Sequence, residues 1–503
     1  MKIALVASGN QQLGVEYISA IMKDKGHDVR LFFDPKTFGG SLFVKIDFIN
    51  QYFNLKDKII DRIIQWSPDI VGFSCMTHNF QWSLSIANEI KKQAPIPIIF
   101  GGIHPTSVPE VVLKQESIDF VAVGEAEDSF AELVSELETG KSLENINKKI
   151  NGIYFKENGE IIANPPAMVG NLDALPFPDK KIFYDKVPSL SNSYHISASR
   201  GCPNSCGYCC NSYLNKVYSH EERRRVRSVD NIIEELKLAK QKYNYSVIEF
   251  IDEIFPDNIS WLEEFSSKYS QEIGIPFCIA MDAGHDFKLV TSDRLQLLKQ
   301  AGCTDVGVGL TSASKNVRKY MGTKQFSNEK FIEVLKMCKS YEFTFATDII
   351  IGTPYETDED LSYNLEFCRT ISPYVEFVYT YWLTYYPKTF VTNKALRHEQ
   401  ISQSAYNDIL EGKGEISYHR GSVVKEKERD KLLTYQILVD LSTLLSAKKH
   451  IWLEKHQSYI NMLPAKTLLH WFFVFLNMTK KDTPNSQMFL LIFKNVFKKT
   501  NCP

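Results

Sequence analysis

The 503-residue chain lacks several features that would each have indicated a particular class of protein. Neither sign of charge dominates, since 58 basic residues face 60 acidic ones and leave a net charge of −2. This balance argues against a general nucleic-acid binder, which needs basic residues to neutralise many phosphates. No apolar run reaches the roughly 18 residues that a membrane-spanning helix needs. The apolar start, residues 1–7, is too short for a signal peptide, so we expect a cytoplasmic protein.

Cysteine is scarce outside one stretch, Arg200–Cys209, which holds Cys202, Cys206 and Cys209 in a Cys-x3-Cys-x2-Cys pattern. Three thiolates at this spacing can bind three irons of a 4Fe-4S cluster and leave the fourth iron open to another ligand. A structural zinc ion would need a fourth ligand, for which Cys210 is poorly placed, and no second Cys-x2-Cys pair exists. The other cysteines are scattered through apolar segments, which disfavours a disulfide framework.

This stretch, with Tyr208 directly before the last cysteine, closely resembles the cluster motif of radical SAM enzymes. The resemblance implies that the open iron takes S-adenosylmethionine (SAM), which an electron from the cluster cleaves to methionine and a 5′-deoxyadenosyl radical. A low-potential electron donor such as flavodoxin or ferredoxin is then an implied partner.

Residues 1–150 alternate short apolar runs with amphipathic ones, beginning with 3–7, 13–25 and 29–33. In the expected helix at 55–66, Ile59, Ile60 and Ile63 fall on one stripe that can be buried. Such alternation predicts a Rossmann-like parallel sheet with helices on both faces, and ligands at the carboxyl ends of its strands.

Residues at these expected strand ends resemble the slot for the nucleotide tail in cobalamin (B12) binding domains, which precede many radical SAM domains. A Ser-x-Leu-like loop and a Gly-Gly loop line that slot, and Ser74 and Gly101-Gly102 match them. Taken alone, glycines at strand ends are as well explained by tight turns. The residues assigned to cobalamin are Ser74, Gly101, Gly102, Gly124 and Glu125.

The chain departs from one cobalamin motif. No Asp-x-His-x-x-Gly sequence occurs, and the first loop reads Ser8-Gly9-Asn10-Gln11-Gln12-Leu13-Gly14. The resemblance then implies base-off cobalamin without a histidine ligand from this loop. His78 and His104 lie nearby in sequence, but a loop histidine beside proline is more commonly structural.

Residues 151–192 predict a linker, with a hairpin at Asn158-Gly159 and a stiff proline-rich connector. Residues 193–390 repeat the β/α rhythm six times, which fits a partial (βα)6 TIM-like barrel with its chemistry at the strand ends. Residues 391–503 predict a helical C-terminal domain.

The radical SAM resemblance also implies where SAM binds. The family places acidic residues after the second strand, although Asp252 and Glu253 are equally explained as a helix N-terminal pair. After the fourth strand the family commonly has Gly-hydrophobic-Glu-Ser, whereas this chain has Thr311 in place of the glutamate. The residues assigned to SAM are Tyr208, Asp252, Glu253, Thr311, Ser312, Gly352 and Pro354.

The tail contains two apolar aromatic segments, 468–476 and 488–497, flanked by lysines. Such helices can lie in a membrane interface, which would make the protein peripheral at the inner membrane face and a lipid substrate plausible. The alternative, which we favour, is that they cap the barrel as core helices.

The leading functional interpretation is a cobalamin-dependent radical SAM methyltransferase that acts on an unactivated carbon of a small molecule or lipid. A second interpretation keeps the cofactors but closes a ring or oxidises, as the anaerobic cyclase of chlorophyll synthesis does. A non-catalytic corrinoid or iron-sulfur sensor is the third. Methylthiotransferases are disfavoured, because their N-terminal domain brings three more cluster cysteines and residues 1–192 contain only Cys75.

Overall fold

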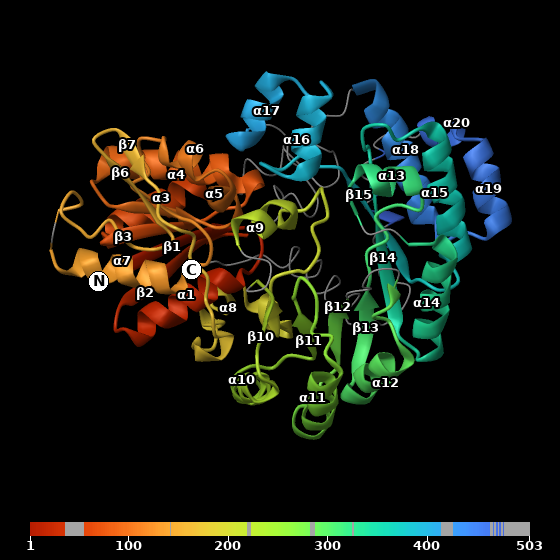
Figure 1. Ribbon diagram of the computed structural model, residues 1–503, viewed down its shortest axis with the longest axis horizontal. Coiled ribbons are helices and arrows are strands. Elements are labelled where there is room, and N and C mark those ends of the chain that lie inside the picture. Colours follow the sequence, from red (N-terminus) through yellow and green to blue (C-terminus); the bar gives the residue numbers. More distant parts are fainter. Residues whose placement is uncertain are drawn as a thin grey trace. The chain divides into compact units, whose positions relative to one another are not determined.

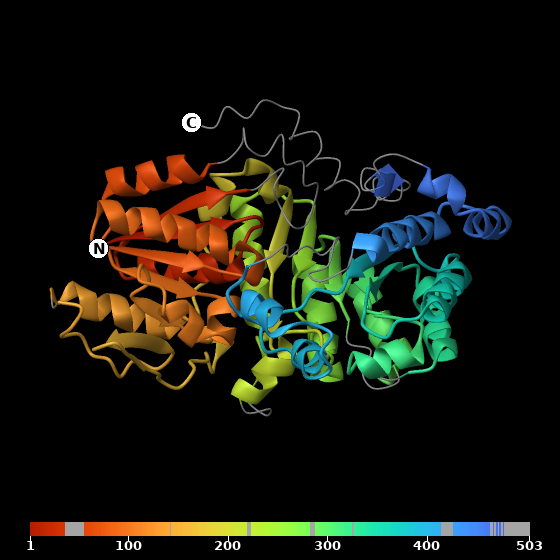
Figure 2. The same cartoon turned by 90° about the horizontal axis from the view of Figure 1, so that it is seen from above.

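A computed structural model describes residues 1–35, 55–140, 142–218, 223–281, 287–323, 326–413 and 426–462, with single positions between 466 and 476. The fold forms two compact units, each assembled from separate segments of the chain. The first unit comprises residues 1–190, 209–222 and 385–416, and the second comprises residues 191–208, 223–384 and 417–503. The ribbon views in Figures 1 and 2 label and colour their elements along the sequence.

The first unit is built on a seven-stranded sheet in the order β2-β1-β3-β4-β5-β6-β7. The first five strands of this order run parallel, and the last two pair antiparallel at one edge. The strands are β1 (Lys2–Ser8), β2 (Asp28–Asp34), β3 (Ile70–Ser74), β4 (Ile98–Gly101), β5 (Phe120–Ala122), β6 (Ile153–Glu157) and β7 (Glu160–Ile162).

Helices cover both faces of this sheet, as predicted, and Figure 2 shows the two helical layers. On one face the sheet packs against the helix that carries the expected stripe of Ile59, Ile60 and Ile63. On the other face it packs against helices that include the one with Leu133. The helices are α1 (Leu13–Asp24), α3 (Lys56–Trp66), α4 (Phe80–Gln93), α5 (Ile103–Ser107), α6 (Pro109–Leu113), α7 (Glu127–Glu138) and α8 (Lys181–Tyr184).

The segment that we expected to be a separate linker is tied into the first unit. The predicted hairpin is present, but its strand β6 pairs with β5 and extends the sheet. Further along, Lys180 donates to the carboxylate of Glu16 on α1 at 2.6 Å, with both side chains at most 1% exposed. The same carboxylate accepts a hydrogen bond from Gln11. A buried ion pair thus fastens the proline-rich connector to the first helix.

The second unit is built on six parallel strands in sequential order, β8-β11-β12-β13-β14-β15, as expected for a partial (βα)6 barrel. The strands are β8 (Ser193–Ile196), β11 (Val247–Phe250), β12 (Phe277–Ala280), β13 (Cys303–Gly307), β14 (Thr344–Ile351) and β15 (Phe377–Trp382). A two-stranded ladder, β9 (Ser199–Arg200) with β10 (Arg225–Val226), frames the cysteine loop.

Helices pack along one face of these strands (Figure 1). They are α10 (Val229–Lys242), α11 (Ile259–Glu272), α12 (Ser292–Ala301), α13 (Lys315–Tyr320), α14 (Asn328–Ser340) and α15 (Asp358–Ile371). Helices α9 (Asn211–Val217), α16 (Phe390–Arg397) and α17 (Gln403–Leu410) belong to the first unit.

The C-terminal segment contributes α18 (Glu426–Ser442), α19 (Ala447–Lys455) and α20 (Ser458–Asn461) to the second unit. Helix α18 packs along the edge strand β15, where the Gln436 amide accepts from the Trp382 indole at 3.0 Å and donates to the Thr380 carbonyl. Among the described residues, no helix is both long and apolar enough to cross a membrane.

Candidate functional site

The chain that enters the cysteine loop is anchored by Asp252, which follows β11. Its carboxylate accepts hydrogen bonds from the Ser199 N–H at 2.5 Å, the Ser199 hydroxyl at 2.6 Å and the Ala198 N–H at 3.1 Å. Burial raises the pKa of this carboxyl to about 6, although these hydrogen bonds oppose the shift. We had assigned Asp252 to SAM, but its oxygens are engaged by the backbone of the loop. Its neighbour Glu253 is exposed.

Gly201 fixes the path of the backbone directly before the first cysteine. It has a φ of +87°, and a Cβ atom there would lie 2.1 Å from the carbonyl oxygen of Arg223. Only glycine fits this crossing without moving the backbone. The buried Arg223 guanidinium in turn donates to the carbonyl of Cys202 at 3.4 Å. Sequence reasoning missed Arg223, whose only signal is a run of three arginines.

The donor chemistry of the loop fits an iron-sulfur cluster. Asn204 directs its backbone N–H and its side-chain amide at the Cys202 sulfur, at 3.4 and 3.5 Å, as suits a thiolate. Cys202 is buried, whereas Cys206 and Cys209 are half-buried. No three His, Cys, Asp or Glu side chains in the described ranges are arranged to hold a metal ion. The cluster assignment therefore rests on the spacing and on this donor chemistry.

The middle of the loop contacts the region that follows β13. The Gly207 N–H donates to the Met321 carbonyl at 2.9 Å, and the Tyr208 hydroxyl lies 3.4 Å from the Thr311 hydroxyl. Thr311 adopts a φ of +63°, which is uncommon for a β-branched residue. The structure thus brings together two residues that the sequence assigned to SAM, Tyr208 and Thr311.

Ser312, a third residue assigned to SAM, is fully buried and holds the loop itself. Its hydroxyl donates to the Asn364 amide at 3.0 Å, and its carbonyl accepts from the Arg318 guanidinium at 2.6 Å. Arg318 is fully buried and stacks over the Phe326 ring at 4.3 Å. A hydroxyl occupied by a buried amide has a structural role, so we no longer place Ser312 against SAM.

The loop after β14 contains Gly352 and Pro354 and encloses a buried carboxyl group. One Glu356 oxygen accepts the N–H groups of Gly352 at 2.8 Å and Thr353 at 3.3 Å. Burial raises the pKa of Glu356 to about 8. The other oxygen of Glu356 and the Thr353 hydroxyl are buried without a hydrogen-bond partner.

In the first unit, Ser74 and Gly101 are register partners at the ends of β3 and β4, so the two predicted cobalamin loops lie side by side. Gly102 has a φ of +102°, and a Cβ there would lie 2.6 Å from the Cys75 carbonyl oxygen. Its backbone therefore packs directly on the neighbouring loop. The loop after β3 and the loop after β4 are therefore in direct backbone contact.

Gly124 and Glu125 bind the connector. The Gly124 N–H donates to the Thr106 hydroxyl at 3.1 Å, and Gly124 pairs with Ala167 in a parallel bridge. One Glu125 carboxylate oxygen accepts the Val169 N–H at 2.8 Å. The structure therefore shows positioning contacts for both residues that we had assigned to cobalamin.

Of the two histidines near these loops, His78 is partly exposed and His104 is buried. His104 is 1% exposed, its ring lies 4.5 Å from the Phe80 ring, and burial lowers its pKa to about 3. It is a core residue, as the sequence suggested. In the Asp-x-His-x-x-Gly motif the histidine lies three residues before the glycine. The residue three positions before Gly14 in this chain is Gln11. The Gln11 side chain is buried and donates a hydrogen bond to the Glu16 carboxylate at 2.6 Å.

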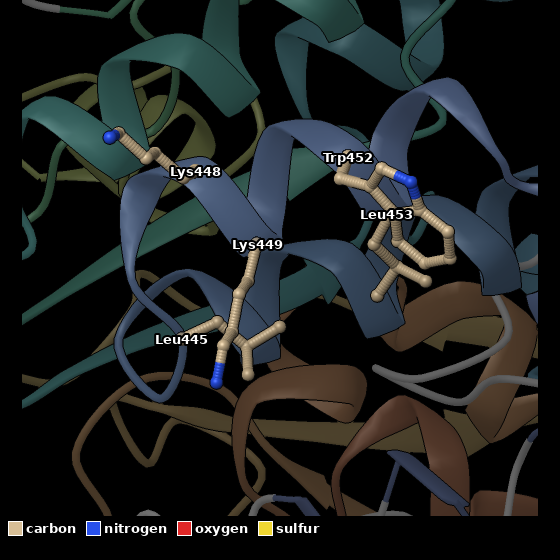
Figure 3. Close-up of a pocket in the computed structure, with 5 residues that line it drawn as sticks. All are labelled: Leu445, Lys448, Lys449, Trp452 and Leu453. Carbon is tan, nitrogen blue, oxygen red and sulfur yellow. The ribbon is translucent and has the colours of Figure 1, made fainter.

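A shallow hollow of about 410 Å³ lies on α19 (Figure 3). It is lined by Leu445, Lys448, Lys449, Trp452 and Leu453. None of the residues assigned to the cluster, SAM or cobalamin lines it.

Comparisons with known proteins match two separate parts of the chain. The family model of the B12 binding domain matches residues 3–134, and that of the radical SAM superfamily matches residues 196–368. An uncharacterized methyltransferase of Pyrococcus horikoshii is 28% identical over 403 residues, which cover 79% of this chain and 81% of that protein. The anaerobic magnesium-protoporphyrin IX monomethyl ester cyclase of Rubrivivax gelatinosus is 24% identical over 373 residues, which cover 71% and 62%.

The fold has solved counterparts. The structure of the cobalamin-dependent S-adenosylmethionine radical enzyme OxsB with aqua-cobalamin bound superposes with a TM-score of 0.66 at 15% identity. The superposition covers 98% of this chain and 75% of that one. The family implies cobalamin, SAM and a 4Fe-4S cluster as cofactors. Taken with the two family matches and the cysteine loop, these findings show that the chain is a radical SAM enzyme with an N-terminal B12-binding domain.

Proposed function

We propose that the protein is a cobalamin-dependent methyltransferase that methylates an unactivated carbon. The observation that carries this proposal is the joint presence of a B12-binding domain and a radical SAM domain in one chain. Its relative from Pyrococcus horikoshii is named an uncharacterized methyltransferase. When bound, the cofactors supply a radical that removes a substrate hydrogen and a methyl group that replaces it.

The geometry supports the following roles for the chain's own residues. Cys202, Cys206 and Cys209 hold the cluster, and Asp252 with Arg223 positions the loop that carries them. Tyr208 and Thr311 border the SAM site, together with the exposed Glu253 and the loop at Gly352 and Pro354. The paired ends of β3 and β4 at Ser74 and Gly101 receive the corrinoid tail.

The experiment is anaerobic reconstitution with iron, sulfide and hydroxocobalamin, followed by incubation with SAM and a strong reductant. We expect both 5′-deoxyadenosine and S-adenosylhomocysteine, because the first reports radical cleavage and the second reports methyl donation. The Cys202→Ala variant should form no 5′-deoxyadenosine, whereas Cys210→Ala, which changes the adjacent cysteine outside the motif, should retain it. The absence of both products from the loaded enzyme would contradict the proposal and favour a sensor.

The second candidate is a radical cyclase or oxidase with the same cofactors. The observation that favours it is the 24% identity to the anaerobic cyclase of Rubrivivax gelatinosus. The same incubation separates the two candidates. Formation of 5′-deoxyadenosine without S-adenosylhomocysteine would favour the cyclase type.

We also propose that the corrinoid binds base-off, with no histidine from the first loop. The support is that Gln11 stands in the histidine's place and is held by Glu16 inside the fold. The electron paramagnetic resonance spectrum of reduced, protein-bound cobalamin tests this point. Nitrogen hyperfine splitting would show an axial nitrogen ligand and would refute the proposal.

Peripheral membrane contact is the last proposal, and it rests on α19 and α20 rather than on the segments 468–476 and 488–497, for which we favour a core role. Within the segment 468–476, Leu469 and Phe473 pack on the core while Phe472 is exposed; the segment 488–497 lies outside the described residues. Trp452 on α19 is more than half exposed and lines the hollow of Figure 3 together with Lys448 and Lys449. Tyr459 on α20, whose ring lies 5.6 Å from the Trp452 ring, is also more than half exposed. Aromatic and lysine side chains together suit an anionic interface. No sedimentation with anionic liposomes at low salt would refute this contact.

A further inference from the structure

The boundary between the two units falls inside the cysteine motif. Cys202, Cys206 and the chain up to Tyr208 belong to the second unit, whereas Cys209 belongs to the first unit, which contains the B12-binding domain. The helix that follows Cys209, α9, has seven residues. A helix this short is not stable by itself, so its position depends on what it contacts. The contacts of α9 therefore decide where the third cluster cysteine is held.

The start of α9 is bonded both to Cys209 and to the segment after the last barrel strand. The Ser212 hydroxyl donates to the Cys209 carbonyl at 2.8 Å, and the Ser212 N–H donates to the same oxygen at 3.0 Å. The Ser212 hydroxyl also accepts the Phe390 N–H at 3.2 Å. The Lys388 ammonium lies 5.6 Å from the centre of the Tyr213 ring. Because all these residues belong to the first unit, the backbone at Cys209 is tied to that unit.

The end of α9 is bonded to the loop after β5. The Tyr218 hydroxyl donates to the Ala167 carbonyl at 3.1 Å, and the same carbonyl accepts the Glu125 N–H at 2.9 Å. A Cβ atom at the neighbouring Gly124 would lie 2.1 Å from the Tyr218 hydroxyl oxygen, so glycine leaves the room that this hydroxyl occupies. One carbonyl group thus joins α9 to the end of β5.

The loop after β5 is in turn bonded to the loop after β4, where we place the corrinoid tail. The Gly124 N–H donates to the Thr106 hydroxyl at 3.1 Å, and the Thr106 N–H donates to the Gly102 carbonyl at 3.0 Å. Gly102 packs on the backbone of Cys75 in the loop after β3. A continuous series of hydrogen bonds and backbone contacts within one unit therefore runs from the proposed corrinoid site to the third cluster cysteine.

An element that contacts two ligand sites can couple them through its own ordering. A ligand that immobilises the loops after β3 and β4 reduces the conformational entropy that binding at the second site must remove, so the two ligands bind cooperatively. Such coupling is reciprocal, and it typically changes an affinity by about 5- to 150-fold.

We propose that Tyr218 is a positioning residue that couples the corrinoid site to the iron-sulfur cluster through α9. Corrinoid binding orders the loops that hold Ala167, Ala167 holds Tyr218, and α9 then holds Cys209 where the cluster requires it. The inference rests on the proposed function, because it takes the edge at Ser74 and Gly101 as the corrinoid site. It adds that each cofactor strengthens the binding of the other.

The coupling can be measured without turnover. The Kd of hydroxocobalamin is determined anaerobically by ultrafiltration for the full chain before and after reconstitution with iron and sulfide, and iron is measured per chain. Tyr218→Phe deletes the hydroxyl that joins α9 to Ala167. Tyr269→Phe is the matched control, because it deletes a hydroxyl that donates to the Ile275 carbonyl at 2.7 Å in the second unit.

We expect the cluster to lower the Kd at least about fivefold in the parent and in Tyr269→Phe, and less than about twofold in Tyr218→Phe. A merely structural role of Tyr218 would weaken binding equally with and without the cluster and would leave this factor unchanged.

Three results would overturn the inference alone: a factor near one in the parent, a factor retained by Tyr218→Phe, or an equal loss in Tyr269→Phe. The proposed function would survive each of them, because it is judged on the products formed. Absence of hydroxocobalamin binding would overturn both.

Discussion

The carboxylate of Asp252 accepts the backbone N–H of Ser199 at 2.5 Å, three residues before the first cysteine of the motif. Asp252→Asn replaces one acceptor oxygen with an N–H donor that faces other donors, so at least one anchoring bond is lost. We expect iron content after reconstitution to fall by about half or more, with a loss of about 1–3 kcal/mol in the free energy of unfolding.

The control for this prediction is Glu253→Gln, which changes the exposed neighbouring carboxylate and should retain iron. Iron is measured per chain, and stability by urea unfolding of the apo-protein. Equal iron content in both variants would show that the anchor is dispensable.

Gly201→Ala should prevent correct formation of the cysteine loop. The added Cβ would lie 2.1 Å from the Arg223 carbonyl oxygen, at a φ of +87°. Gly302→Ala is the matched control, because its φ is +101° and nothing lies within 4 Å of the added atom. We expect Gly302→Ala to cost about 1 kcal/mol from backbone strain alone. Gly201→Ala should lower the free energy of unfolding further and should also abolish the absorbance of the bound cluster. Equal stability and equal cluster absorbance in the two variants would contradict this prediction.

Glu356 predicts a pH dependence of stability. Its pKa rises from 4.5 to about 8 on folding, so the folded state holds the proton more tightly and stability falls as pH rises through this range. Glu356→Gln keeps an acceptor for Gly352 and Thr353 but carries no charge. By urea unfolding, we expect the variant to exceed the parent by roughly 1–4 kcal/mol at pH 9 and to differ little at pH 5. A constant difference across this range would exclude Glu356 as the cause.

The buried pair of Lys180 and Glu16 should couple the connector to the first helix. Lys180→Met leaves the Glu16 carboxylate without the cation 2.6 Å away, and we expect a loss of about 3–5 kcal/mol in unfolding free energy. The double variant with Glu16→Gln removes the stranded charge and should recover most of the loss. A double-mutant cycle by urea denaturation measures the coupling, and additive losses would mean that the two side chains act independently.

Much of the architecture could be predicted, because it depends on local periodicity. The helix expected at 55–66 is found at Lys56–Trp66, and the six β/α repeats form a sheet in sequential order. The iron-sulfur site could be predicted because the spacing of Cys202, Cys206 and Cys209 is typical of this cluster.

The roles of single polar residues were not predictable in the same way. Asp252 and Ser312 match motif positions assigned to SAM, yet their partners are Ser199, 53 residues away, and Asn364, 52 residues away. The hydrogen-bonding of a carboxylate depends on which backbone donors the fold brings to it, and this information is absent from local sequence.

The packing of α18 along β15 also bears on behaviour at high concentration. β15 lies at the edge of its sheet, and the side-chain amide of Gln436 on α18 donates a hydrogen bond to the carbonyl of Thr380 on that strand. An uncovered edge strand offers a template on which a second molecule can add its own strand, the first step of aggregation. A chain that ends before α18 would expose this template, so the C-terminal helices protect the finished barrel from aggregation as well as completing its core.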